Sequence, residues 1–196
     1  MPAGQFRPEI IIFEFFLFSF SGWICETINE TITRGKFVNK GFFSGPYTIS
    51  QGIGGIGVYL ICSPFKAEPL VVFAAGMAIC TAVEYIMSIF LEKCFGVKCW
   101  DYTTYPHTKW CSYQGRIALT TSLFFGLITL FVVYIYWQLG VKATEFLGDF
   151  TWHVDAVLSV IFIADAVYTC TKLLRFKKAG IKIKNYAVFS DTETPE

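Results

Sequence analysis

Residues 117–139 read IALTTSLFFGLITLFVVYIYWQL, an uninterrupted run without a charged side chain. A helix needs about 20 predominantly apolar residues to cross the hydrocarbon core of a bilayer, so this run predicts a transmembrane helix. Arg116 stands directly before the run. An arginine therefore lies at the mouth of the span, where an ionisable group must be paired or hydrated.

Four further runs are apolar enough, or nearly so, to span a bilayer: residues 10–32, 47–65, 69–91 and 152–174. The 196-residue chain is 54% hydrophobic and only 16% charged. A soluble domain carries about a quarter charged residues, which favours a membrane protein. We expect an all-α, polytopic helix bundle of about five transmembrane helices over residues 1–175. A cytoplasmic tail over residues 176–196, basic and then acidic, is expected to be partly disordered.

The basic residues predict how the bundle is oriented. Short cytoplasmic loops collect Lys and Arg. If the amino terminus is outside, then of the 16 Lys and Arg only Arg7, Lys66 and Lys142 fall on the outer side. The first run is too long for a cleaved signal peptide, so we expect it to remain as a span. We expect a multi-pass protein of the cell membrane, in contact with membrane lipids, with its amino terminus outside and its carboxyl terminus inside.

The second run, residues 47–65, is the least regular of the five. It contains Gln51 and glycines at positions 52, 54, 55 and 57. Such a segment is too polar and flexible to face lipid, so we place it inside the bundle. Two interpretations stay open: a helix broken near residues 52–55, or glycines that let neighbouring helices pack closely.

Polar residues of the first run share one helical face, because Glu26, Asn29, Glu30 and Thr33 follow the i, i+3, i+4, i+7 spacing. This face lies in the last turns before the predicted cytoplasmic boundary. We expect Glu30 and Thr33 to be interfacial. Glu26, one turn deeper, should point inward to a partner.

Glu84 of the third run lies at a depth comparable to that of Glu26 and Arg116. A guanidinium has five N–H donors and can bridge two carboxylates. The sequence therefore predicts a cluster of these three side chains. It is either a structural ion pair or a protonatable carboxylate that exchanges its partner for a substrate or a proton.

The last run contains two aspartates. Asp155 lies near its outer end and is expected to be interfacial and hydrated. Asp165 lies near the middle without a local basic partner. It is either a neutral hydrogen-bonding acid or part of the same interior site as Glu84.

The segment 93–115 carries Cys94, Cys99, His107 and Cys111, but their spacing is not that of structural zinc sites. The chain contains no phosphate-binding loop, no Gly-x-Ser-x-Gly elbow and no His-Glu-x-x-His pair. We therefore expect no cofactor, no metal and no ATPase activity of its own. The basic residues form no stripe, which argues against nucleic acid as a partner.

Five motifs resemble, in order, those of a bacterial membrane family named putative ABC-transporter type IV. They are Gly22-Trp23-x-x-Glu26, Phe37-Val38-Asn39-Lys40-Gly41-Phe42 with Gly45-Pro46, Glu84-Tyr85, Trp100-Asp101-Tyr102 with Pro106, and Gly115-Arg116-Ile117. The resemblance covers residues 15–130. Lys40 stands where the family usually has Arg, and Ile49-Ser50-Gln51 replaces a Pro-Ile-Tyr stretch.

The resemblance implies a transporter permease subunit that works with an ATP-binding subunit or with a second copy of itself. Its motifs and the residues above give one candidate substrate or ion-pair cluster: Glu26, Asn39, Lys40, Glu84, Tyr85, Asp101, Arg116 and Asp165. One alternative is a small membrane enzyme acting on a lipid or isoprenoid headgroup, with Glu84 or Asp101 as general base and Arg116 holding phosphate. A third is a structural or regulatory membrane subunit.

Overall fold

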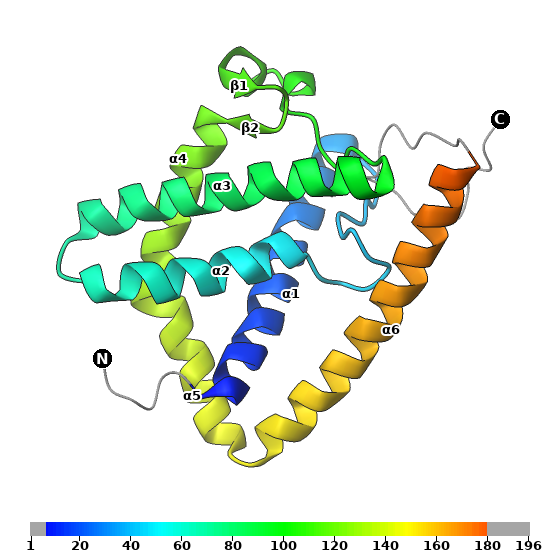
Figure 1. Cartoon of the computed structure of the whole chain (residues 1–196). Coiled ribbons are helices and arrows are strands. Elements are labelled where there is room, and N and C mark those ends of the chain that lie inside the picture. The colour runs from blue at the N-terminus through cyan, green and yellow to red at the C-terminus, as the bar shows by residue number, and fades with distance from the viewer. Residues whose placement is uncertain (1–6, 180–196) are drawn as a thin grey trace.

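The computed structural model describes residues 7–179, which fold almost entirely into helices (Figure 1). The α-helices are α1 (Pro8–Arg34), α2 (Ile49–Cys62), α3 (Pro69–Phe95), α4 (Leu119–Phe131), α5 (Trp137–Leu147) and α6 (Phe150–Lys178). Short 3-10 turns occupy Ser63–Phe65, Tyr102–Thr104 and Lys109–Cys111. Strands β1 (Ser112–Tyr113) and β2 (Ile117–Ala118) pair antiparallel before α4. The predicted helical membrane bundle is confirmed.

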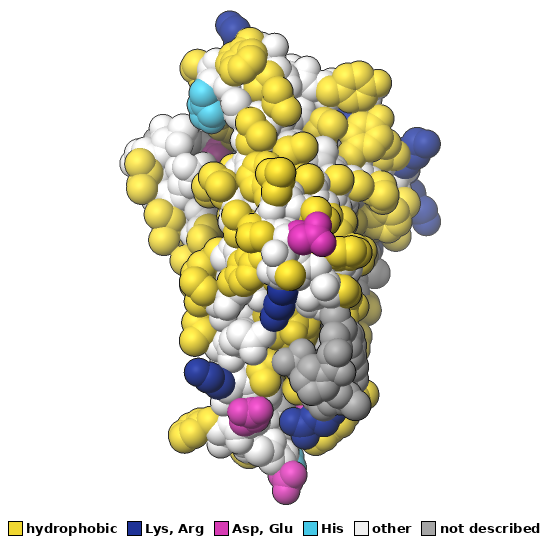
Figure 2. Space-filling model, turned by 90° about the vertical axis from the view of Figure 1, so that its left-hand side faces the viewer, with side chains coloured by type: hydrophobic (Ala, Val, Ile, Leu, Met, Phe, Trp, Pro, Cys, Tyr) yellow, Lys and Arg dark blue, Asp and Glu magenta, His cyan; other side chains and the backbone are white. Residues whose placement is uncertain are grey.

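Within residues 7–179, four helical segments are long and apolar enough to cross a membrane: Pro8–Thr33, Pro69–Phe95, Leu119–Leu147 and Phe150–Lys178. The second predicted run forms a shorter apolar helix, Ile49–Phe65. Many large hydrophobic side chains are exposed, and Figure 2 shows them gathered over the upper part of one face, with one acidic and one basic side chain near its middle and further charges toward its ends. An apolar surface of this extent, on helices of this length, is that of a multi-pass membrane protein.

α2 is one continuous helix through its glycines, so the break near residues 52–55 is not observed. The alternative interpretation explains the glycines. A Cβ atom at Gly52 would lie 2.3 Å from Ser19 Oγ, and one at Gly22 of α1 would lie 2.4 Å from Gln51 Cγ. Glycine therefore lets α1 and α2 approach each other closely, as small residues do in membrane bundles.

The two ends of the bundle carry different segments (Figure 1). Residues 26–48 and 84–118, with the ends of α1 and α3 and the beginning of α4, gather at what we call the loop end. Residues 7–14 and 140–155, with the beginning of α1 and the α5–α6 turn, meet at what we call the turn end. α2 and α3 form a hairpin that lies across α1 and α4.

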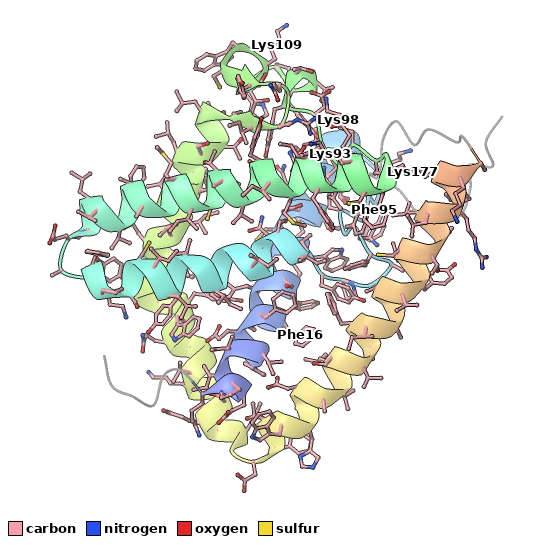
Figure 3. All side chains as sticks on the ribbon, viewed as in Figure 1. Phe16, Lys93, Phe95, Lys98, Lys109 and Lys177 are labelled. Carbon is pink, nitrogen blue, oxygen red and sulfur yellow. The ribbon has the colours of Figure 1, made fainter. Side chains whose placement is uncertain are left out.

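α6 packs against α1 and α3. Near the middle of α6, the Phe162 ring lies 5.9 Å from the Phe16 ring, which is labelled between α1 and α6 in Figure 3. At the carboxyl end of α6, Lys177 Nζ donates hydrogen bonds to the carbonyl oxygens of Lys93 (2.7 Å) and Cys94 (3.0 Å) at the end of α3. Cations are favourable at the carboxyl end of a helix. The tail predicted beyond residue 179 lies outside the described residues.

Residues Val132–Tyr136 form a π-helical turn between α4 and α5. Directly after it, the ring of Trp137 stacks on that of Tyr59 in α2, with centroids 3.6 Å apart. The Tyr136 hydroxyl shares a hydrogen bond with Ser21 and donates to Leu17 O at 3.2 Å on α1. The widened turn thus directs two aromatic rings into the core between α1 and α2.

Candidate functional site

Two of the predicted carboxylates lie at the loop end, on α1 and α3. Glu26 Oε1 accepts a hydrogen bond from Gln51 Nε2 of α2 at 2.8 Å. Glu84 Oε1 accepts one from the Tyr102 hydroxyl at 2.5 Å. Glu84 Oε2 is buried and has no hydrogen-bond partner among the described residues. The two carboxylates are close enough to interact electrostatically.

Lys40 and Glu30 form an ion pair next to Glu26. Lys40 Nζ lies 3.5 Å from Glu30 Oε2, and the Tyr105 hydroxyl donates to the same oxygen at 3.1 Å. Glu30 is only 2% exposed, so at its predicted interfacial position it is covered by protein rather than by solvent. The reason is that residues from the two loops of this end, Lys40 and Tyr105, cover it. Lys40 also interacts electrostatically with Glu26.

Arg116 does not join Glu26 and Glu84, and its predicted pairing with them was wrong. Its NH1 donates to Ser88 Oγ at 2.8 Å, and its NH2 forms an ion pair with Glu92. Ser88 and Glu92 follow Glu84 on the same face of α3, about 6 and 12 Å farther along the helix. The guanidinium therefore fastens the segment before α4 to the end of α3.

The motif Trp100-Asp101-Tyr102 packs on the motif Gly115-Arg116. Trp100 Nε1 donates to Arg116 O, and the Tyr102 backbone N–H donates to Gly115 O, both at 2.9 Å. Gly115 has φ +67°, and a Cβ atom there would lie 2.3 Å from Asp101 Oδ1. Only glycine satisfies both conditions. These contacts place Tyr102 where its hydroxyl reaches Glu84.

The surroundings of the loop shift the pKa values of Asp101 and Tyr102 in opposite directions. Burial favours a higher pKa for Asp101, but hydrogen bonds from Lys98 and Thr103 outweigh it and hold the pKa below its usual value. Burial and the neighbouring Glu84 raise the pKa of Tyr102, so its phenol keeps the proton that it donates. Asp101 is thus an anion held by Lys98 and Thr103. Tyr85 turns aside, and its hydroxyl donates to Gln114 Oε1 at 3.3 Å.

Asn39 and Asp165 hold the segment that joins α1 to α2. Asn39 Oδ1 accepts hydrogen bonds from Trp23 Nε1 at 2.6 Å and from the Gly41 N–H at 3.0 Å. Asp165 of α6 accepts from the backbone N–H groups of Ser44 (3.2 Å) and Gly45 (2.7 Å), from the Tyr47 hydroxyl and from Thr169. Of its two predicted roles, hydrogen bonding is the one observed. Asp165 serves this loop and stands apart from the Glu26–Glu84 pair.

The loop cysteines do not form a metal site in this structure. Among the residues described, no three His, Cys, Asp or Glu side chains lie close enough together to hold a metal ion. Burial raises the pKa of Cys99 to about 12, so its thiol stays protonated.

Two further acids were missed or misplaced by sequence reasoning. Glu14 of α1, which the sequence analysis passed over, is 0% exposed, and neither of its oxygens has a hydrogen-bond partner within residues 7–179. Asp155 was predicted to be hydrated but is 2% exposed and equally unpartnered in the described part of the chain. The signal for Glu14 was available, because it is an ionisable residue inside the apolar run 10–32, as Glu26 and Glu30 are.

Comparison with known proteins defines the family. The model of the family described as putative ABC-transporter type IV matches residues 13–170. The chain belongs to this family. A search of curated proteins and a search of solved structures return no match. The match to the type IV family extends past residue 130 and includes Asp165. All five motifs of the resemblance lie at or near the loop end, where they contact one another.

Proposed function

We propose that the chain is the membrane-spanning permease component of a transporter and that Glu26 and Glu84 bind a positively charged group of its cargo. Membership of the type IV family supports a transport-related integral membrane protein. The site is inferred from Glu84 Oε2, a buried oxygen to which no group in residues 7–179 donates a hydrogen bond, and which lies within electrostatic reach of a second carboxylate. A buried charge of this kind is costly unless it gains a partner.

The charges around the pair favour a cation. Glu26, Glu30 and Glu84 lie together, whereas Lys40 is the cation that interacts with Glu30 and Glu26. An ammonium or guanidinium group supplies both the missing positive charge and N–H donors for Glu84 Oε2. Arg116, which could have played that role from within the chain, is held by Glu92. The site is therefore one that a cationic group of a substrate completes.

The proposed setting is the cytoplasmic half of the bundle, with the amino terminus outside. The loop end then faces an ATP-binding subunit or a second copy of the chain. Trp110 and Tyr113, on the loop that carries Tyr102, are 71% and 58% exposed. Exposed aromatic side chains are frequent anchors of protein interfaces.

The cation site is tested by ligand-induced stabilisation of the purified protein. Methylammonium, spermidine and guanidinium are titrated at constant ionic strength while the thermal midpoint is measured. A ligand that binds only the folded state raises this midpoint with concentration. We expect at least one of the three to do so in the wild type and to lose its effect in Glu84→Gln.

The matched control is Glu68→Gln, which removes an exposed carboxylate at the beginning of α3. This variant should respond as the wild type does. No stabilisation by any of the three cations, or equal stabilisation of Glu84→Gln, would contradict the proposed site.

The permease role is tested by mild solubilisation of the membrane and copurification. We expect an ATP-binding subunit or a second copy to remain attached, and Trp110→Ala to weaken the attachment. Trp152→Ala removes an exposed indole at the turn end and serves as the matched control. Recovery of the wild type as a monomer without any partner would count against the assignment.

A further inference from the structure

The turn end contains a carboxyl group that none of the proposed chemistry uses. Glu14 lies on α1 and is fully buried, and neither oxygen has a hydrogen-bond partner in the described range. A Cβ atom at Gly140 would lie 2.0 Å from Glu14 Oε1, so the carboxyl group packs directly on α5. The titratable groups that interact with it electrostatically are Tyr59 of α2 and Tyr136 of the π-helical turn.

These surroundings suit a protonated acid better than a bound metal cation. Two phenols and a glycine provide no positive charge to balance a carboxylate. A hard cation takes about six oxygen ligands. No group of three metal-ligating side chains is found in the described residues. The neutral acid is the form whose burial costs least.

A cavity of about 270 Å³ lies at the same end of the bundle, with Arg7, Glu9, Thr144 and Thr151 among its lining residues. Glu9 precedes Glu14 by five residues, which is about 7.5 Å along α1. Thr144 follows Gly140 by one turn of α5. Glu14 on α1 and its neighbour Gly140 on α5 therefore lie only one to one and a half turns from residues that line the cavity.

Asp155 is the second unpartnered carboxyl group in this region. It follows the cavity residue Thr151 by one turn of α6, is 2% exposed and interacts electrostatically with Glu9. Phe162, two turns beyond Asp155, contacts Phe16. Asp155 therefore lies beside the part of α1 that lines the cavity, since it follows the cavity residue Thr151 on α6 and interacts electrostatically with the cavity residue Glu9.

We propose that Glu14 is an exchangeable proton-binding site, reached from this cavity through water, with Asp155 assisting the transfer. In each exchange the Glu14 O–H bond breaks and the proton passes to water of the cavity. The carboxylate then takes a proton back from the same route. The proposal does not depend on the cation site at the loop end, which lies on the opposite side of the bundle.

Infrared spectroscopy of the protein in liposomes tests the proposal, because a protonated carboxyl group has a C=O stretching band separate from that of a carboxylate. We expect the wild type to show such a band at neutral pH and Glu14→Gln to lack it. On transfer to D2O the band should shift, and Asp155→Asn should slow that shift several-fold. Glu68→Gln, which removes an exposed carboxylate between α2 and α3, should leave the band unchanged.

Three results would overturn the proposal. A wild-type spectrum indistinguishable from that of Glu14→Gln would mean that Glu14 is ionised. A band that does not shift in D2O would mean that the acid is sealed from water. An unchanged rate of shift in Asp155→Asn would remove Asp155 from the route.

A measurement on the wild type keeps the test valid if Glu14→Gln fails to fold. Dicyclohexylcarbodiimide adds to a protonated carboxyl group in an apolar setting and leaves a stable N-acylurea. Peptide mass spectrometry should find this adduct on Glu14, with less of it as the pH is raised. Absence of the adduct, or a yield independent of pH, would contradict an exchangeable proton.

Discussion

A methyl group at Gly76 should force α3 and α4 apart. A Cβ atom there would lie 2.1 Å from Thr129 Oγ1, 2.2 Å from Thr129 Cγ2 and 2.4 Å from Thr129 Cβ. Rotation of the Thr129 side chain can move the first two atoms but not Cβ, which is bonded to the backbone of α4. The helices themselves must therefore shift.

Overpacking of this kind costs about 1–3 kcal/mol. We expect the cost of Gly76→Ala to lie near the upper end of this range, because Thr129 Cβ cannot move away by rotation of a side chain. Alanine recovers up to about 1 kcal/mol through its higher helix propensity. The net expectation is a loss of about 2 kcal/mol in the free energy of unfolding.

Gly57→Ala is the matched control, because a Cβ atom at Gly57 in α2 would lie 3.8 Å from its nearest neighbour, Ile79 Cγ2. This variant gains the propensity without the clash and should be stabilised by up to about 1 kcal/mol. The two alanine variants should thus differ in sign. Reversible unfolding in mixed micelles, followed by tryptophan fluorescence, measures both.

Adding Thr129→Gly to Gly76→Ala removes the Cβ contact, and a double-mutant cycle should show a favourable coupling between the two changes. Equal stability of Gly76→Ala and Gly57→Ala, or zero coupling, would refute the close contact of α3 and α4.

Three further predictions concern the loop end and the segment beside α6. Asp165→Asn replaces an acceptor of backbone N–H groups by an amide that must also donate, so we expect a loss of about 1–3 kcal/mol in stability and faster proteolysis of residues 35–48; Thr169→Val, which removes a single hydrogen bond, should cost less. The pKa of Asp101 is lower in the folded state, so its contribution to stability is present above pH ~4 and disappears as the pH falls below that value. The stability of Asp101→Asn should fall less steeply than that of the wild type as the pH is lowered below this value. Parallel pH profiles of the two proteins would show that Asp101 does not contribute. Hydrogen bonds with Thr120 lower the pKa of Cys111, whereas burial raises that of Cys99 to about 12. A maleimide should therefore modify Cys111 before Cys99 at neutral pH, as mass spectrometry can establish, and preferential modification of Cys99 would show that its site is open.

The long helices could be predicted from the sequence because hydrophobic length alone requires them. Residues 69–91 and 152–174 lie within α3 and α6, which extend only a few residues beyond these runs. α2 was harder, since its glycines fit both a broken helix and a tightly packed one. The choice depends on residues of α1, such as Phe15 and Ser19, that a reading of α2 alone does not contain.

The partners of the charged residues could be predicted less well, because depth in the membrane does not fix which face of a helix a side chain reaches. Arg116 was placed at the level of Glu84, but it reaches Ser88 and Glu92 on later turns of the same face. The Tyr102 hydroxyl donates a hydrogen bond to Glu84 instead, because the loop before α4 brings Tyr102 next to α3. Asp165 is similar, since its donors come from a distant segment whose conformation the sequence pattern does not specify.

The π-helical turn at Val132–Tyr136 makes the chain sensitive to length at one place. Each residue of a helix turns the following ones by about 100°. Deleting a single residue from this turn would therefore leave α4 in place while rotating Trp137 away from Tyr59 and Gly140 away from Glu14. The aromatic stack and the buried acid would lose their neighbours together, although no side chain among them had been altered. A deletion at residues 132–136 would thus disrupt the contacts of α5 with α1 and α2 without changing any side chain that makes them.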